Sequence, residues 1–187
     1  NVLSASYNGQ TIETSTPLTT DGTIAFYTWD DAKGKEAFWH SSAHVLAQTI
    51  MHFYPAAKLT IGPAIENGFY YDVDLGEETI SDKDFKKIED KMLEFARQKF
   101  EFNMRSASKA EALEMYKNNE FKTELITNLE DGTITFCDHA DFTDLCRGGH
   151  IPNTGFIKAT KVMSVAGAYW RGDEKNKQLT RVYGITF

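Results

Sequence analysis

The sequence predicts an α+β fold in which helices pack against a mostly antiparallel sheet. Two long segments, residues 36–54 and 81–100, place apolar residues at helical spacing. Several shorter segments alternate apolar and polar residues, as half-buried strands do. The helical and extended segments do not alternate regularly along the chain. That order favours antiparallel pairing over the parallel sheet of repeated strand–helix–strand units.

The bulk composition indicates an ordinary globular protein. A chain of 187 residues suits one domain with a substantial core, or one domain with a small appendage. No apolar run reaches membrane-spanning length, and the first residues, NVLSASYNGQ, do not read as a signal peptide. With only two cysteines, Cys137 and Cys146, we expect reduced thiols and a cytoplasmic protein. The start inside a strand-like segment, without Met, suggests a fragment of a longer protein.

The first 31 residues are expected to form strands and turns. Asn8-Gly9 lies between alternating residues, which is a good signal for a β-hairpin. A second extended segment, residues 23–29, follows the turn signal Asp21-Gly22. This piece is too short to bury much surface by itself, so it must lean on the rest of the chain.

The next segment, residues 36–54, is predicted to be a helix. Pro55 ends it, because proline lacks the backbone N–H that a helix interior needs. Its apolar residues recur at helical spacing and form one stripe, which consists of Phe38, Val45, Leu46, Thr49, Ile50 and Phe53.

Two further helices have recognisable beginnings. Ser81 and Asp84 resemble a capping box at the start of residues 81–100, although Asp stands where Glu or Gln is usual. A shorter helix is expected after Ser108, with Glu111 three residues on. The remaining segments are predicted strands, at residues 68–75, 121–126, 132–137, 156–165, 168–172 and 178–187.

Two histidines stand one helical turn apart in the first helix. His40 and His44 share one face, opposite the apolar stripe. Their spacing is that of a metalloprotease zinc pair, but Ser41 occupies the place of the glutamate that such a protease needs as general base. The pair therefore predicts a metal site, a catalytic base or a structural role, and a protease is excluded.

A second group of chemistry-bearing residues lies about a hundred positions later. Cys146 and His150 flank Gly148-Gly149 in the loop sequence DLCRGGHIPNTG. Together with His40 and His44 they form a set of ligands that suits tetrahedral zinc. Alternatively, Cys146 is a nucleophile beside a histidine base, or simply a small buried hydrophobic residue. The sequence contains no phosphate-binding glycine loop.

Four long motifs resemble the amino-terminal half of the bacterial threonyl-tRNA synthetase family. They are HSSAHVLAQTIMHFYP, IGPAIENGFYYDVD, DLCRGGHIPNTG and AGAYWRGDEKNKQLTRVYG, and their order and spacing match along residues 35–187. The resemblance implies a partial β-grasp (TGS-like) module at residues 1–33 and a tRNA editing domain, the second additional domain of threonyl and alanyl synthetases, at 34–187. Gly149 stands where the family commonly has Pro, and Ser42 where Cys is common.

The resemblance implies translation proofreading. Serine differs from threonine by one methyl group, and a pocket discriminates against such a loss by only about 1–3 kcal/mol. A second site must therefore hydrolyse serine from the tRNA for threonine, while the extra methyl of threonine is excluded. Two alternatives stay open: a zinc-dependent deacylase of the alanyl type, and a non-catalytic tRNA-binding module.

Roles in this reaction are assigned residue by residue. His40 is the candidate general base. Lys122 matches a lysine that the family places in the site, and it is expected either to stabilise negative charge on the ester oxygen or to help orient the water. Without the resemblance, Lys122 would be taken for a surface lysine on a strand. His44, Cys146 and His150 complete the catalytic set by lining the pocket and holding ligand and water.

Three other residues are candidate substrate contacts. Tyr71 and Asp144 are expected to meet the ribose or the serine amino and hydroxyl groups, although Tyr71 also suits a core and Asp144 a turn. Arg147 and the basic stretch after Lys158 are expected to meet tRNA phosphates, although a net charge of −7 argues mildly against nucleic acid.

Expectations for cofactors and partners follow from the same resemblance. Editing should require no cofactor, but zinc stays open, held by His40, His44, Cys146 and His150 as in alanyl-type domains. The partner is the acceptor end of the tRNA for threonine carrying serine, and no membrane is involved. The full-length protein is expected to use ATP, magnesium and zinc in a catalytic domain absent from this chain, and to form a homodimer, whereas this fragment should be monomeric.

Overall fold

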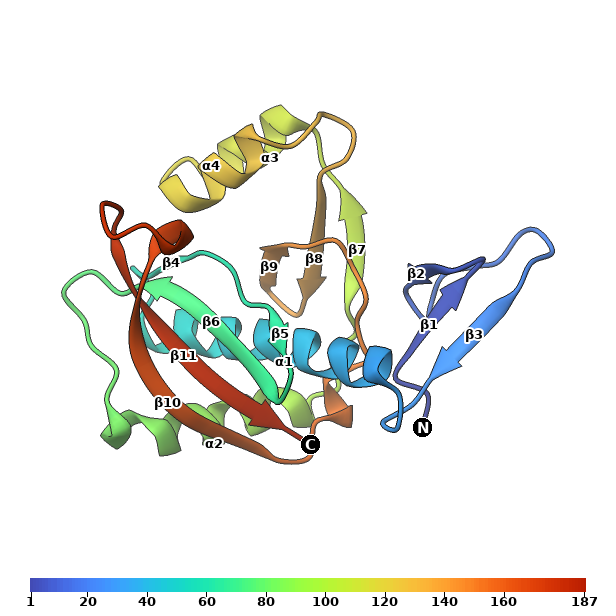
Figure 1. Ribbon diagram of the computed structural model, residues 1–187, viewed down its shortest axis with the longest axis horizontal. Helices are drawn as coiled ribbons and strands as arrows, with labels where there is room; N and C mark the ends of the chain where they lie inside the picture. Colours follow the sequence, from blue (N-terminus) through green and yellow to red (C-terminus); the bar gives the residue numbers. More distant parts are fainter.

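The computed structural model describes all residues from Asn1 to Phe187 and contains three antiparallel sheets (Figure 1). The helices are α1 (Ala32–Phe53), α2 (Asp82–Arg97), α3 (Lys109–Met115) and α4 (Glu120–Thr127), with short 3-10 turns at Thr154–Phe156 and Trp170–Gly172. The strands are β1 (Ser4–Tyr7), β2 (Gln10–Ile12), β3 (Ile24–Tyr27), β4 (Lys58–Leu59), β5 (Ala64–Ile65), β6 (Gly68–Asp74), β7 (Asn103–Ser106), β8 (Thr135–His139), β9 (Phe142–Leu145), β10 (Thr160–Tyr169) and β11 (Gln178–Thr186).

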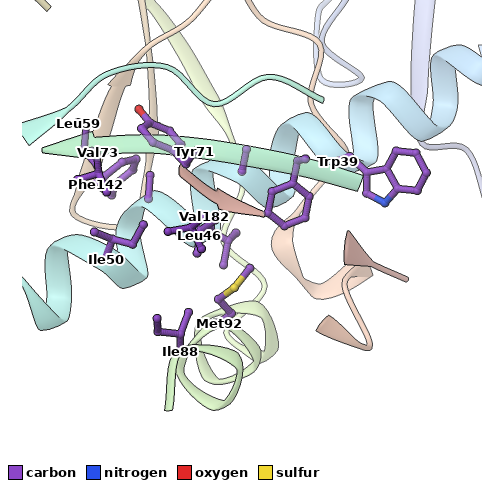
Figure 2. Packing of buried hydrophobic residues seen from close by; sticks show 14 of the residues in the cluster. Trp39, Leu46, Ile50, Leu59, Tyr71, Val73, Ile88, Met92, Phe142 and Val182 are labelled. Carbon is purple, nitrogen blue, oxygen red and sulfur yellow. The ribbon is translucent and has the colours of Figure 1, made fainter. Parts of the chain in front are cut away.

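The largest sheet has the strand order β10-β11-β6-β4, with β5 added beside β6. In its register Val182 of β11 faces Tyr71 of β6, so both side chains point to the same side of the sheet. The helices α1 and α2 lie together on that side (Figure 1). The main core fills the space between this sheet and the two helices, and Leu46, Ile88 and Val182 are fully buried there (Figure 2).

Helix α1 is buried almost all round. The predicted apolar stripe faces the large sheet, but the opposite side is covered as well, and His44 on that side is only 4% exposed. Ser41 and Ser42 tolerate burial because their hydroxyls donate to the carbonyls of Ala37 and Phe38 one turn earlier, at 2.7 and 2.8 Å. A helix enclosed in this way holds its histidines in fixed positions.

The predicted beginnings of the second and third helices are confirmed. The backbone N–H of Ser81 donates to the Asp84 carboxylate at 2.9 Å, which completes a capping box at α2. The hydroxyl of Ser108 accepts from the N–H of Glu111 at 3.1 Å and caps α3. Each bond satisfies a backbone donor that has no partner within the helix.

Two smaller sheets flank the large one. Strands β2-β1-β3 form the amino-terminal sheet, in which Asn8 and Gly9 make the predicted hairpin turn with positive φ. Strands β7-β8-β9 form the other, and α3 and α4 lie beyond one end of it (Figure 1). The short strands β4, β5, β7 and β9 were not predicted, because few residues in each alternate.

The segment 121–126, predicted as a strand, is instead part of helix α4. The reason is Asn119, whose side-chain oxygen accepts the N–H groups of Phe121 and Lys122, both at 3.1 Å, and so nucleates the helix. A second predicted strand, 168–172, is wrong in its later part, where Trp170–Gly172 forms a 3-10 turn. Alternation over five or six residues is too little to separate a strand from a short capped helix.

The α+β class and the mostly antiparallel pairing are confirmed. The proposed division between residues 1–33 and 34–187 stays a prediction. None of the helices combines the length and the apolar character that crossing a membrane would require.

Candidate functional site

A cleft of about 750 Å³ opens between the amino-terminal sheet, α1, α4 and the loop after β9. Most of the predicted site residues line it, namely His40, His44, Tyr71, Lys122, Asp144, Cys146 and Arg147. Arg147 is exposed at its edge. The exception is His150, which is fully buried and forms no part of the cleft wall.

The two histidines of α1 meet the loop after β9 around one sulfur atom. The Nε2 atom of His40 lies 3.1 Å from Cys146 Sγ, and the Nε2 atom of His150 lies 3.3 Å from it. The His44 ring is 4.8 Å from the His40 ring and 5.1 Å from the His150 ring, measured between centroids. The predicted meeting of the two motifs in space is therefore confirmed.

This cluster fits a tetrahedral metal ion. One ligand atom from each of His40, His44, Cys146 and His150 lies within 4.8 Å of the others. Ligand atoms around zinc are separated by roughly 3.3–3.8 Å, so only small movements would be needed. The Nε2 atom of His44 is buried and has no hydrogen-bond partner. A buried nitrogen without a hydrogen-bond partner is free to act as a metal ligand.

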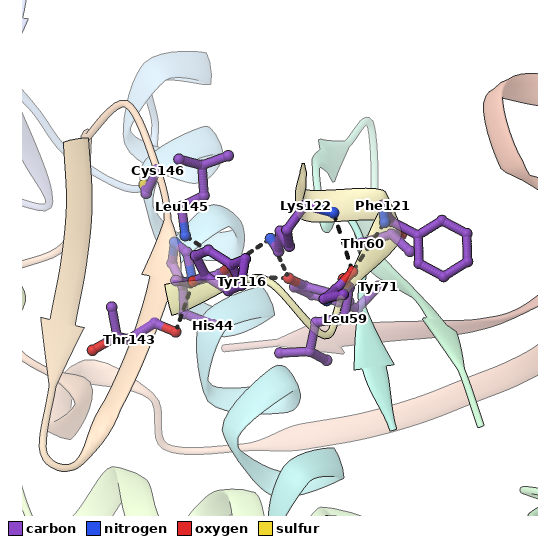
Figure 3. Close-up of polar contacts among 12 residues, drawn as sticks. His44, Leu59, Thr60, Tyr71, Tyr116, Phe121, Lys122, Thr143, Leu145 and Cys146 are labelled. Carbon is purple, nitrogen blue, oxygen red and sulfur yellow. Dashed lines mark hydrogen bonds and ion pairs between the residues drawn. The ribbon is translucent and has the colours of Figure 1, made fainter. Parts of the chain in front are cut away.

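The side chains of His44, Tyr71 and Lys122, from α1, β6 and α4, come together in one polar network (Figure 3), and Asp144 links them. Its Oδ1 atom accepts from Lys122 Nζ at 2.6 Å, and its Oδ2 atom accepts from the Tyr71 hydroxyl at 2.8 Å. The Nδ1 atom of His44 lies 3.2 Å from the same Oδ2. Lys122 is not a surface residue on a strand, because it lies in helix α4 and is only 2% exposed.

The buried charges are mutually compensating. Burial by itself would raise the pKa of Asp144, but the ammonium of Lys122 and the imidazole of His44 outweigh it and lower this pKa below its usual range. Burial raises the pKa of the Tyr71 hydroxyl well above its usual value, and Asp144 adds to that effect. Tyr71 is therefore a neutral donor and Asp144 an ionised acceptor, as their hydrogen bond requires.

Cys146 is held as a thiolate. Burial opposes ionisation, but the positive charge of His44 and the hydrogen bonds from His150 and His40 prevail and lower the pKa of Cys146 to about 3. Burial alone would lower the pKa of His44, but the negative charge of Cys146 and the hydrogen bond with Asp144 outweigh it and raise this pKa to about 10. The two groups therefore form a thiolate–imidazolium pair.

His40 differs from its neighbours. Burial lowers its pKa below the usual value for histidine, and the hydrogen bond to Cys146 only partly offsets this effect. Its ring is half-buried, whereas those of His44 and His150 are buried. A neutral imidazole at the wall of an open cleft can accept a proton from a bound water molecule.

Sequence reasoning missed Glu13. It follows β2 in the amino-terminal sheet, yet its carboxylate contacts His150, 137 positions away. Nothing in the local sequence marks it, because the segment contains no motif and the contact depends on how two sheets pack. Asp144 was expected to contact substrate, but its oxygens are already occupied by protein groups.

Part of the chain matches a class of domain found in aminoacyl-tRNA synthetases. Residues 134–183 match the family described as the threonyl and alanyl tRNA synthetase second additional domain. This segment contains Asp144, Cys146 and His150 of the site.

The particular proteins to which the whole chain is similar are threonine--tRNA ligases. The identity is 74% with the ligase of Flavobacterium johnsoniae, 67% with that of Flavobacterium psychrophilum and 56% with that of Parabacteroides distasonis. Each match covers all of this chain but 29% of the relative, so the chain spans about three tenths of the length of these curated relatives. The chain is thus homologous to a section of threonine--tRNA ligases, and the family resemblance in the four motifs is confirmed.

Proposed function

We propose that this chain hydrolyses the ester that joins serine to the terminal ribose of the tRNA for threonine. The observation that carries this proposal is that His40 and Lys122 line the same open cleft from different elements. One provides a base and the other a positive charge, which are the two groups that water attack on an ester needs. The tRNA partner is supported by the similarity of the chain to threonine--tRNA ligases.

In the proposed reaction His40 removes a proton from water as the water oxygen attacks the ester carbonyl carbon. The resulting tetrahedral species collapses with cleavage of the bond to the ribose oxygen, and the imidazolium returns its proton to that oxygen. The products are free serine and uncharged tRNA. The lowered pKa of His40 keeps the imidazole neutral before the attack.

Lys122 is proposed to stabilise the oxyanion. Its ammonium group has three N–H donors, and two are directed to Asp144 Oδ1 at 2.6 Å and to the Tyr71 hydroxyl at 3.4 Å. One donor is left for the substrate. Asp144 and Tyr71 therefore act mainly by orienting Lys122, although both also line the cleft.

The edge of the cleft suits the tRNA. Arg147 is exposed beside Cys146, and its guanidinium is well placed for a phosphate of the acceptor end. The expected roles of ATP, magnesium and a second subunit belong to the longer proteins and stay predictions.

A zinc-dependent deacylase is the second candidate. The close set of ligand atoms and the unpartnered His44 Nε2 favour it. His40, His44, Cys146 and His150 would hold the ion, which would supply Lewis acidity toward water or the ester carbonyl. However, a zinc ion bound by all four side chains would occupy the lone pair of His40 and remove it as a base.

Deacylation of two charged forms of the tRNA for threonine tests the proposal. The 187-residue chain should release serine well above the buffer rate and leave the threonyl ester intact. Release of alanine from the tRNA for alanine, dependent on zinc, would favour the second candidate. If the chain binds the tRNA but hydrolyses neither ester, it is a binding module and the enzymatic proposal is overturned.

A further inference from the structure

We propose that Glu13 is a positioning residue for the editing reaction, acting on His40 through His150 and Cys146. This inference rests on the proposed function, because the reaction it would affect is the deacylation described above. It gives the amino-terminal sheet a role in catalysis rather than only in packing.

The carboxylate of Glu13 is directed into the loop that carries His150. Its Oε1 atom accepts the backbone N–H of Gly149 at 2.6 Å, and its Oε2 atom accepts that of His150 at 3.4 Å. Both oxygens also lie 3.2 Å from the Nδ1 atom of the His150 ring. The Glu13 side chain is only 15% exposed, so these bonds are largely shielded from water.

The two glycines allow this contact. Gly148 has φ of +102°, and a Cβ atom there would lie 2.8 Å from Glu13 Oε1. Gly149 has φ of +90° and donates the shortest of the bonds to Glu13. A proline at position 149 would have no N–H to donate and could not adopt this φ. The contact with Glu13 therefore requires glycine at this position. It also restrains the loop, whose backbone the two glycines would otherwise make flexible.

The contact also fixes the orientation of the His150 ring. A carboxylate can only accept, so Nδ1 of His150 donates to Glu13, and this bond holds the ring with Nε2 directed toward the sulfur. That Nε2 atom lies 3.3 Å from Cys146 Sγ, and the sulfur lies 3.1 Å from His40 Nε2. A continuous set of contacts therefore runs from Glu13 to the proposed base, although His150 itself does not reach the cleft.

The variant Glu13→Gln distinguishes positioning of the His150 ring from simple anchoring of the loop backbone. Glutamine keeps an oxygen that can accept the Gly149 N–H, so an anchoring role predicts a variant like the wild type. Its amide nitrogen replaces Oε2 and faces the backbone N–H and the Nδ1–H of His150 with hydrogens of its own, so a positioning role predicts a fall in kcat of about tenfold with KM unchanged. Glu13→Ala should lose activity at least as strongly. Asp21→Asn is the matched control, since Asp21 is an exposed carboxylate of the same segment.

Long-range proton–nitrogen NMR of the histidine rings gives a readout independent of activity. The His150 signals should show a protonated Nδ1 in the wild type and should change in Glu13→Gln but not in Asp21→Asn. If the wild type shows no deacylation, the proposed function fails while the NMR spectra still test the contact. Identical His150 signals in the wild type, Glu13→Gln and Glu13→Ala, or unchanged kcat in both variants of an active enzyme, would overturn the inference.

Discussion

The Nε2 atom of His40 lies 3.1 Å from the sulfur of Cys146, although 106 positions separate the two residues. This contact joins helix α1 to the loop after β9 and brings the two motifs into one site. It also bears on the role of His40. A neutral ring that donates from Nε2 to the thiolate keeps the lone pair of Nδ1 for a proton from water. A metal ion bound at Nε2 would shift the ring hydrogen to Nδ1 and remove that lone pair.

Replacing His40 by alanine should abolish most of the deacylation. A positioned general base contributes about 10²–10⁴-fold, so a loss of at least a hundredfold in kcat is expected. The half-buried ring leaves a small space, and the melting temperature should change little. His52→Ala is the matched control, because His52 is exposed on the same helix. Retention of near-full activity in His40→Ala would remove His40 from the base role.

Replacing Lys122 by methionine should destabilise the fold as well as the reaction. The change leaves the carboxylate of Asp144, whose side chain is 3% exposed, with His44 as its only remaining cationic partner. Breaking a buried pair in this way costs about 3–5 kcal/mol in the free energy of unfolding, measured by urea denaturation. The double variant with Asp144→Asn should recover part of that loss. Lys58→Met, which breaks an exposed pair with Glu120, should lose much less.

Zinc should inhibit the proposed hydrolysis. A chelator is expected to leave the rate of serine release unchanged, and added zinc to lower it at least tenfold, because the ion would compete for His40. Cobalt should report the same site by a thiolate absorption band that persists in Cys137→Ala and disappears in Cys146→Ala. Loss of activity in chelator, with recovery on adding zinc, would instead support the zinc-dependent deacylase.

The two cysteines should differ sharply in alkylation. The pKa of Cys146 is lowered to about 3, so it stays ionised at every pH above that value and should react with iodoacetamide at similar rates at pH 6 and pH 8. Burial raises the pKa of Cys137 far above its usual range, and this thiol is 1% exposed, so it should stay unmodified. Mass spectrometry of the folded chain checks both statements. A rate for Cys146 that rises steeply between the two pH values would contradict the thiolate assignment.

Gly149→Ala should lower both stability and activity. The glycine has φ of +90°, where a side chain is strained, and we expect a cost of about 1–2 kcal/mol in the free energy of unfolding. Gly132→Ala is a close control, since Gly132 has φ of +89° in an exposed turn. Both variants should lose similar stability, but only Gly149→Ala should displace His150 and slow deacylation. Equal deacylation rates in the two variants would show that this loop does not matter for the reaction.

Local signals in the sequence were sufficient for much of the fold. The spacing of Phe38, Leu46 and Phe53 predicted α1, and the capping residues Ser81 and Ser108 placed the beginnings of α2 and α3. The same reasoning failed for residues 121–126, where a single capping residue, Asn119, outweighed a short alternating pattern. Short segments carry too few residues for periodicity to decide between helix and strand.

By itself the sequence determined which residues carry the chemistry. Histidine, cysteine, lysine and aspartate are recognisable because few other side chains bind metals or move protons, and their spacing within each motif is local. Only the tertiary structure decided how they act. Lys122 became a buried partner of Asp144, and Glu13 reached His150 across 137 positions. Such contacts depend on how separate sheets and helices pack, and packing joins residues that no local pattern connects.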